Sequence, residues 1–375
     1  GAANMKIIID LSYIFRLDSG GKTQFSFILL KGISKIDTNN DYTIICNDSL
    51  AGLIKSTFPA FKTIVIKDYY NFRYNKILYI FMDSLYKNFI IPHIIKKQNP
   101  DLVFFPHDCV CLLNMYKKIK TVMLPHDIQP ISNPMRIPFM LRYYYNIYYP
   151  QDFKYMDKII AISDADKNEM ETFFPRYINK FRKIYNPIDT DAYEEFTYNS
   201  AKQNTIVAVN YAGPHKNCLT LVKAFHSIVK ETECNLILIG NPDKTIIDYI
   251  EAHGLDNRIT VTGYIDDYAK NNYLANCRLY INPTLFEGFG MTAVEAIMLG
   301  APCLLSDIPV NREVTLGYAD FYYPPEDADV LAEKILESLA KKHTDEELIT
   351  RAKIIAEKYN YIKAAKEYIK FFEER

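Results

Sequence analysis

Short apolar runs alternate with longer amphipathic segments along most of the chain. The apolar runs of the first half are KIIID (6–10), YTIIC (42–46), KTIVI (62–66), DLVFF (101–105), KTVML (120–124) and KIIAIS (158–163). Their length and aliphatic content indicate buried strands, and most of the segments between them, such as 22–36 and 73–98, have the apolar spacing of helices. This alternation predicts a parallel sheet with helices on both faces.

The alternation stops at the polar stretch 183–204 and then resumes. The later runs are TIVAV (205–209), NLILIG (235–240), ITVTG (259–263), RLYINP (278–283) and PCLLSD (302–307). We therefore predict an α/β fold with two doubly wound domains, residues 5–185 and 205–358, joined by a linker at 186–204. The pattern leaves open which domain the last helix, 359–375, packs on. Ligands of such sheets bind at the carboxyl ends of the strands, so we expect the domains to face a cleft for a two-part substrate.

The composition favours a fully folded protein, since 49% of the 375 residues are hydrophobic. Residues 1–189 carry a net charge of +8 and the remainder −9, which indicates either an anionic partner for the first half or drift in surface composition. The seven cysteines include no CxxC pair, so we expect reduced thiols in the cytoplasm. We find no spanning helix, no signal peptide and no nucleic-acid motif.

The strongest chemical signal is the stretch LFEGFGMTAVEA (285–296), which follows an apolar run and continues as a helix. Gly288 and Gly290 would let the backbone approach a ligand closely, and the first helical amides would suit a phosphate. Glu295, further along the helix, would accept hydrogen bonds from two vicinal ribose hydroxyls. Glu287 would face a sugar at the other end. The alternative for either acid alone is an ordinary surface glutamate.

The string EGFGMTAVEAIMLGAPCLLSD closely resembles the E-x7-E motif and following strand of retaining glycosyltransferases of the GT-B fold, family 4. The resemblance extends through residues 160–189, 263–284 and 311–335. In the first domain, DSGGKTQF (18–25) resembles the family's glycine-rich loop and TVMLPHDIQPISNP (121–134) its His-Asp segment. It implies a metal-independent transferase without a cofactor, two Rossmann-like domains facing a cleft, and a last helix that packs back on the N-terminal domain.

The resemblance also implies roles for residues of the second domain. Glu295 would bind the donor ribose, Glu287 would contact the transferred sugar near its reacting centre, and Lys216 would neutralise the diphosphate leaving group. Other donor-binding residues, chiefly through backbone amides, would be Gly288, Phe289, Gly290 and Met291. The family often has an arginine five residues before the lysine, and this chain has Tyr211 there. We therefore expect Lys216, another cation or more backbone amides to hold the diphosphate.

In the first domain, the resemblance places His126 near the donor sugar and the acceptor, where it would orient a hydroxyl or help a proton leave. Without the resemblance, a satisfied core histidine would be the better interpretation. Gly21 would lie near the donor phosphates, with a simple tight turn as its alternative. The remaining acceptor-side candidates are Asp127, Lys22 and His107.

Two stretches, 69–97 and 135–155, mix aromatic, aliphatic and basic residues. They indicate a membrane interface, a buried tyrosine-rich helix face or an aromatic acceptor site. We predict a cytoplasmic hexosyltransferase that uses a UDP- or GDP-linked sugar. Its acceptor would be a glycan or lipid-linked saccharide hydroxyl in surface polysaccharide synthesis, and peripheral contact with the plasma membrane stays open. The alternatives are another GT-B enzyme, such as a sugar-nucleotide epimerase or a phosphorylase, and a non-catalytic sugar-nucleotide-binding protein.

Overall fold

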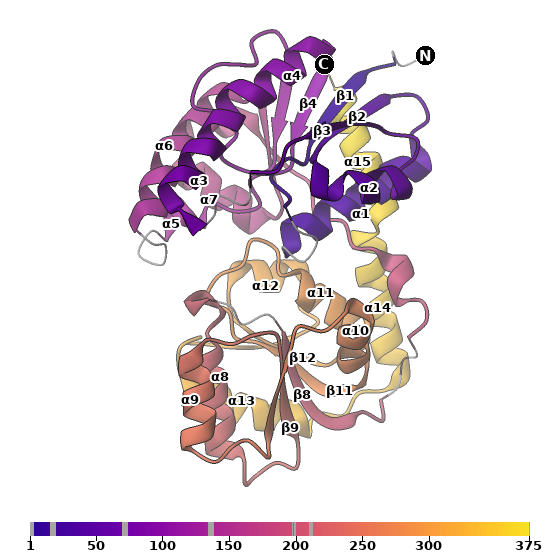
Figure 1. Cartoon of the computed structure of the whole chain (residues 1–375). Helices are drawn as coiled ribbons and strands as arrows, with labels where there is room; N and C mark the ends of the chain where they lie inside the picture. Colours follow the sequence, from indigo (N-terminus) through magenta and orange to yellow (C-terminus); the bar gives the residue numbers. More distant parts are fainter. Residues whose placement is uncertain are drawn as a thin grey trace. The chain divides into compact units, whose positions relative to one another are not determined.

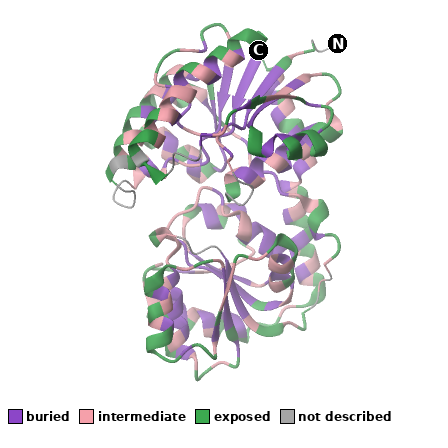
Figure 2. Ribbon diagram, in the orientation of Figure 1, coloured by how far each residue is buried: buried purple, intermediate pink, exposed green. Residues whose placement is uncertain are grey.

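The structure, a computed structural model, describes residues 4–15, 20–69, 74–133, 139–196, 198, 200–209 and 213–374, apart from the side chains of Lys76 and Met140. The chain divides into two compact units (Figure 1). Unit 1 comprises Gly1–Pro187 and Tyr361–Arg375, and unit 2 comprises Ile188–Asn360. Each unit has its own parallel sheet, and the buried residues concentrate on the strands and on the helix faces turned toward them (Figure 2).

Unit 1 is built on a seven-stranded parallel sheet in the order β3-β2-β1-β4-β5-β6-β7. Its strands are β1 (Lys6–Asp10), β2 (Asp41–Asn47), β3 (Lys62–Ile66), β4 (Leu102–Phe105), β5 (Lys120–Met123), β6 (Lys158–Ala161) and β7 (Phe181–Lys183). The sequence pattern missed β7, which reads FRK and has too few apolar residues to stand out. The strand order reverses between β1 and β4, and this switch point is where such sheets bind ligands.

The helices of unit 1 cover the sheet and present their apolar sides to it. They are α1 (Gly21–Ile36), α2 (Asp48–Thr57), α3 (Lys76–Leu85), the π-helix η2 (Tyr86–Ile90), α4 (Ile91–Gln98), α5 (Gln129–Ser132), α6 (Phe139–Tyr155), α7 (Asp164–Phe173) and the 3-10 helix η4 (Pro175–Lys180). In α1, Phe25, Leu29 and Ile33 repeat every four residues and are buried, as expected for the core-facing stripe of an amphipathic helix.

Unit 2 has a six-stranded parallel sheet in the order β10-β9-β8-β11-β12-β13. Its strands are β8 (Gln203–Val209), β9 (Asn235–Ile239), β10 (Ile259–Gly263), β11 (Cys277–Asn282), β12 (Cys303–Ser306) and β13 (Asp320–Tyr322). Its helices are η5 (Thr190–Tyr193), η6 (Pro214–Lys216), α8 (Cys218–Ile228), α9 (Lys244–Ala252), α10 (Asp267–Asn276), α11 (Met291–Met298), α12 (Pro309–Val314), α13 (Ala328–Ala340) and α14 (Asp345–Tyr359). The strand order again reverses next to the first strand, between β8 and β11.

The segment that follows Pro187, which the sequence suggested as a linker, is part of unit 2. The amide of Ile188 donates to the carbonyl of Tyr359 at 2.8 Å. The side-chain amide of Asn360 donates to the hydroxyl of Thr190, also at 2.8 Å. These hydrogen bonds tie the start of unit 2 to its end, so the chain enters and leaves this unit at neighbouring points.

The last helix, α15 (Tyr361–Glu373), belongs to unit 1 although it follows unit 2 in the chain. It lies against α1, where a Cβ on Gly32 would be 2.7 Å from the Cβ of Ala365 and 2.8 Å from the carbonyl oxygen of Tyr361. A larger residue at position 32 would therefore force the two helices apart. Within the described ranges, no helix combines the length and the apolar character needed to cross a bilayer.

Candidate functional site

The loop after β11 becomes helix α11 at Gly290. This glycine has a φ of 78°, in the left-handed region that strains other residues. A Cβ there would meet the Oδ1 of Asn311 at 3.7 Å, an ordinary contact, so the backbone conformation rather than crowding requires glycine. Because α11 starts at Met291, its first amides point out of the helix toward the carboxyl end of the sheet. Such a helix start suits an anion.

Lys216 and Glu287 meet beside this helix start. The Nζ of Lys216 lies 2.5 Å from the Oε1 of Glu287, and the two side chains are 20% and 16% exposed. Their loops follow β8 and β11, which are neighbours in the sheet. The amide of Leu285 fastens one loop to the other by donating to the carbonyl of His215 at 2.8 Å. The fold thus brings together two residues that are 71 positions apart.

Glu295 lies in the second turn of α11 and is only 1% exposed. Its Oε2 is 3.0 Å from the Nζ of Lys270, which comes from α10. The hydroxyl of Tyr193, in η5, also hydrogen-bonds to Glu295. Burial raises the pKa of Tyr193 well above its usual range, and the charge of Glu295 adds to this effect, so the hydroxyl stays a donor.

The other donor-side residues surround the same turn. The ring of Phe289 is buried and packs edge-on against Tyr359 of α14, with 5.3 Å between the ring centroids. This side chain therefore anchors the loop to the unit. Gly288 and Met291, on either side of it, are half-buried. Tyr211, the departure from the family pattern, lies outside the described residues.

In unit 1, His126 and His107 follow β5 and β4. His126 has a φ of 70° and is 6% exposed. Its Nε2 is 3.0 Å from the carbonyl oxygen of Pro106. A carbonyl only accepts, so Nε2 carries the proton and Nδ1 is the acceptor. His107 is also buried: its Nε2 is 3.3 Å from Asp10, and its ring packs on Tyr13 at 4.7 Å. These contacts favour a structural role for His107.

Lys22 and Asp127 lie in a polar cluster of the same unit. The Nζ of Lys22 donates to the Oδ2 of Asp108 at 3.0 Å, and the hydroxyl of Tyr149 donates to the same oxygen at 3.0 Å. The hydroxyl of Tyr149 also reaches the carbonyl of Asp127, whose own carboxylate accepts from the amide of Gln129. The cluster thus joins α1, α6 and the loops after β4 and β5.

The two glycines at the start of α1 have different positions in the structure, and the tight turn lies at Gly20 rather than at Gly21. Gly20 has a φ of 87° and forms the turn, whereas Gly21 is the first residue of α1. Apart from its chain neighbours and its own helix, no atom of the described residues lies within 4 Å of a Cβ built on Gly21. The conformational requirement for glycine therefore falls on Gly20.

Sequence reasoning missed three residues that contact the candidates: Lys270 and Tyr193 beside Glu295, and Tyr149 beside Asp127. Asp108 could have been found from PHD at 106–108, which repeats PHD at 125–127 after a second strand of the same sheet. No local signal marked Lys270 or Tyr193, because each lies in an ordinary polar stretch. Among the described residues, no group of three or more His, Cys, Asp or Glu side chains is placed to hold a metal ion.

The state of His126 leads to a prediction about pH. Burial, with the nearby charge of Lys22, lowers the pKa of His126 to about 3. In the unfolded state His126 binds a proton near pH 6.5, whereas in the folded state it stays neutral down to about pH 3. The free energy of unfolding therefore falls as the pH drops below 6.5. This term should cost about 2 kcal/mol between pH 7.5 and pH 5.

Urea unfolding of wild type and His126→Asn at the two pH values measures this term. Asparagine tolerates a positive φ and keeps a donor for Pro106. We expect the variant to lose less stability than wild type on acidification. Equal losses in both proteins would contradict the assignment.

Two family models match the chain. The model described as "Glycosyl transferases group 1" matches residues 189–355, and the model "Glycosyltransferase Family 4" matches residues 42–192. The first covers the unit with the α11 loop, and the second covers most of unit 1. Together they account for the chain from residue 42 to residue 355.

Bacterial relatives have similar sequences. The chain is 25% identical to the O-antigen chain mannosyltransferase RfbU of Salmonella typhimurium over 237 residues, 62% of this chain and 64% of the relative. It is 23% identical to the serotype-specific mannosyltransferase WbdA of Escherichia coli over 375 residues, 93% of this chain and 45% of WbdA. The matches thus span less than two thirds of either relative.

Solved structures share the fold. HepE of Anabaena, in complex with UDP and glucose, superposes with a TM-score of 0.72 at 16% identity over 98% of this chain and 99% of HepE. The sucrose-phosphate synthase of Thermosynechococcus elongatus gives a TM-score of 0.73 at 15% identity, with 98% of each chain covered. At these identities the likeness concerns the fold alone.

Two doubly wound parallel units and the likeness to solved structures define the GT-B fold, and the two family models identify a glycosyltransferase. Within that class, the two matching models show that the chain belongs to the family 4 type. These findings confirm the fold class and the family that the sequence indicated.

Proposed function

We propose that this glycosyltransferase moves a hexose-type sugar from a UDP- or GDP-linked donor to a hydroxyl of a glycan or lipid-linked saccharide, with retention of configuration and without a metal ion. The observation that carries the proposal is the ion pair of Lys216 and Glu287 at the start of α11, with Glu295 in the same helix. The O-antigen mannosyltransferase relatives favour mannose and surface polysaccharide synthesis. The Anabaena neighbour was solved in complex with UDP and glucose, so we keep UDP beside GDP as a candidate nucleotide.

When the donor binds, Lys216 would exchange its carboxylate partner for the diphosphate. The helix start offers amides to a phosphate, and Lys216 supplies a fixed cation. This cation lies 2.5 Å from Glu287. A bound diphosphate would take over the ammonium and release the carboxylate of Glu287 for the sugar. The same cation would then stabilise the negative charge that develops as the glycosidic bond breaks.

Retention would follow from attack on the same face that the diphosphate leaves. A double displacement needs a carboxylate placed as a nucleophile. Once the diphosphate has taken over Lys216, Glu287 would accept hydrogen bonds from hydroxyls of the sugar, which is a binding role and not that of a nucleophile. This favours delivery of the acceptor hydroxyl beside the leaving diphosphate, whose oxygen would take the hydroxyl proton.

Binding of nucleotides to wild type and Glu295→Ala tests the donor site. UDP-, GDP-, ADP-, dTDP- and CMP-sugars and the free diphosphates are added in a thermal unfolding experiment. One nucleotide class should stabilise wild type by about 2.7 kcal/mol at a concentration one hundred times its Kd. Glu295→Ala should lose most of this stabilisation. Glu333→Ala, on an exposed position of α13, should keep it.

No stabilisation of wild type by any nucleotide would refute the donor site. Turnover then separates the alternative functions. A transferase releases free nucleoside diphosphate only with an acceptor present. An epimerase changes the donor without an acceptor, a phosphorylase needs inorganic phosphate, and a binding protein leaves the donor intact.

We also propose that unit 1 contacts a membrane, as expected if the acceptor is lipid-linked. The apolar face of unit 1, as we define it, comprises Ile77, Phe81, Phe89, Leu113, Phe139, Tyr143 and Ile147, each between 42% and 77% exposed. These residues come from α3, η2, the loop after β4 and α6. The hydroxyl of Tyr148 in α6 binds Asn88 and Ser84 at 3.0 and 3.1 Å, which holds these helices side by side.

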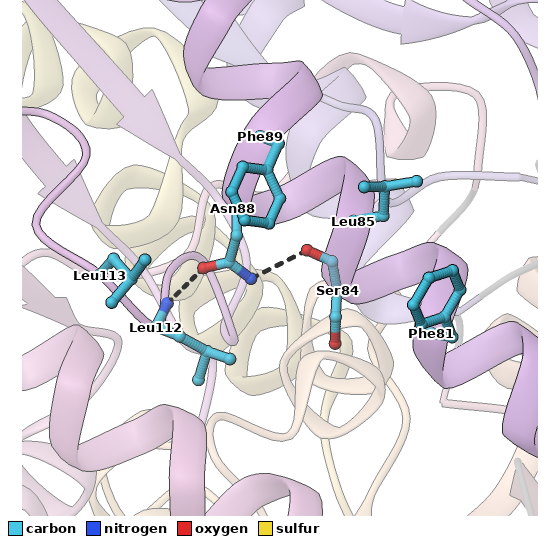
Figure 3. A pocket seen from close by; sticks show the side chains of 7 residues that line it. All are labelled: Phe81, Ser84, Leu85, Asn88, Phe89, Leu112 and Leu113. Carbon is cyan, nitrogen blue, oxygen red and sulfur yellow. Dashed lines mark hydrogen bonds between the residues drawn. The ribbon is translucent and has the colours of Figure 1, made fainter.

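A pocket opens within the apolar face (Figure 3). It measures about 290 Å³ and is lined by Phe81, Ser84, Leu85, Asn88, Phe89, Leu112 and Leu113. Asn88 fixes its floor by donating to the carbonyl of Ser84 and accepting from the amide of Leu112. Residues 69–97 carry five basic residues and one acidic one. An apolar hollow in a basic segment suits an anionic bilayer, with one lipid chain in the hollow.

Vesicle flotation tests this contact. Wild type should float with vesicles of phosphatidylcholine and phosphatidylglycerol, and less with phosphatidylcholine alone. Phe81→Ser combined with Phe89→Ser should weaken binding about tenfold or more, since each buried phenylalanine contributes ~1.5–3 kcal/mol. Phe173→Ser, 45% exposed at the end of α7, is the control. Equal flotation of all three proteins, or none by wild type, would contradict membrane contact through this face.

A further inference from the structure

The carboxylate of Glu295 is enclosed by side chains of its own unit. Its side chain is 2% exposed, and the Nζ of Lys270 lies 3.0 Å from its Oε2. Tyr193 supplies a hydrogen bond from another segment. A ribose cannot make two hydrogen bonds to this carboxylate while both neighbours stay in place, because too little of it is accessible.

Lys270 is the neighbour that can leave. Tyr193 is 7% exposed, and its aromatic side chain is rigid, so its hydroxyl has little freedom to move away from Glu295. The side chain of Lys270 is a flexible four-carbon stem, and its Nζ is also 3.2 Å from the Oδ1 of Asp267. Asp267 is 81% exposed. The ammonium therefore bridges a buried carboxylate and one in solvent, and it keeps a partner if it gives up Glu295.

We propose that Lys270 competes with the nucleotide at the ribose subsite: its ammonium holds Glu295 until the vicinal hydroxyls of a nucleoside diphosphate replace it. This inference rests on the proposed function and deepens it. Both hydroxyls are needed, because a single neutral hydrogen bond to Glu295 would be weaker than the ion pair with Lys270 that it replaces. Lys270 moves to Asp267 as the ribose arrives. The subsite thus selects ribonucleotides over deoxynucleotides, and part of the binding free energy is spent on the displacement.

Isothermal titration of UDP and GDP, with their 2′-deoxy and 3′-deoxy counterparts, tests the exchange. Lys270→Met keeps the stem but removes the competing ammonium, so the ribonucleotide should bind about tenfold more tightly, as expected for a charge-assisted hydrogen bond. The deoxy compounds should gain less. Asp267→Asn removes the second partner, so it should weaken ribonucleotide binding several-fold.

Two further variants complete the test. Lys270→Gln leaves a neutral donor beside Glu295 and should bind with intermediate affinity, which keeps the test valid if the methionine variant does not fold. Lys244→Met removes an exposed ion pair to Asp248 on α9 and should change nothing.

The outcomes separate this inference from the proposed function. If wild type binds neither UDP nor GDP, the proposed function fails. If wild type binds and prefers the ribonucleotide, but Lys270→Met and Lys270→Gln bind it more weakly, then Lys270 merely supports Glu295 and the exchange is wrong. Unchanged binding in Asp267→Asn would likewise overturn the role given to Asp267.

Discussion

Replacing Lys216 with methionine is expected to lower kcat for sugar transfer by a factor of ~10²–10³, the usual cost of losing one fixed group that stabilises transition-state charge. Lys216 is the cation held at the start of α11, 2.5 Å from Glu287. The charge on the diphosphate grows as the glycosidic bond breaks, so the loss should fall mainly on kcat. A methionine keeps the length of the stem but carries no charge.

The measurement is release of nucleoside diphosphate under acceptor-dependent turnover, with kcat and KM determined separately. Lys341→Met is a matched control, because Lys341, the residue after α13, pairs with Asp320 of β13 at the same 2.5 Å but at the surface. That control should keep its rate. A Lys216→Met enzyme with more than a tenth of the wild-type kcat would show that another group carries the leaving-group charge.

Truncating Phe372 to alanine is expected to destabilise unit 1 by about 3–5 kcal/mol, the range for a fully buried phenylalanine. Phe372 is 0% exposed. Its ring lies 5.3 Å from that of Phe104 in β4 and 6.0 Å from that of Tyr368. The variant would leave a cavity between α15 and the sheet of unit 1.

Hydrogen exchange resolved along the chain measures this effect. Amides of β1 and β4 should exchange faster in Phe372→Ala, while those of β8 and β11 should keep their protection. Phe173→Ala, 45% exposed on α7, controls for loss of an aromatic ring at the surface. A loss below about 1 kcal/mol, or faster exchange confined to unit 2, would contradict the packing of α15 as an integral helix of unit 1.

Much of the fold followed from the sequence because its causes are local. A buried parallel strand needs a short apolar run, and its helix needs apolar residues three and four apart. The runs at 6–10 and 278–283 could therefore be read directly as strands. The glycines before α11 were also visible, but the sequence predicted a close approach of the backbone to a ligand, whereas the positive φ of Gly290 came from the structure. Strand β7 was missed because three residues carry too little pattern.

The candidate site was only partly readable. Glu287, Glu295 and Lys216 came from a resemblance to a family, and the structure shows what surrounds each of them. The pairing of Lys216 with Glu287 spans 71 positions, and that of Lys270 with Glu295 spans 25. A local pattern shows which residues are polar, but it does not show which distant residue each one meets.

The sequence by itself determined the α/β alternation, the break between two sheets and the glycine-led helix start, because each depends on residues within one or two turns or one strand. Only the tertiary structure decided that the chain from Ile188 to Asn360 belongs to unit 2, that Glu295 is enclosed by Lys270 and Tyr193, and that the apolar face surrounds a pocket. The physical reason is that a buried charge or an apolar face needs a partner, and the chain's path in three dimensions selects which partner it receives.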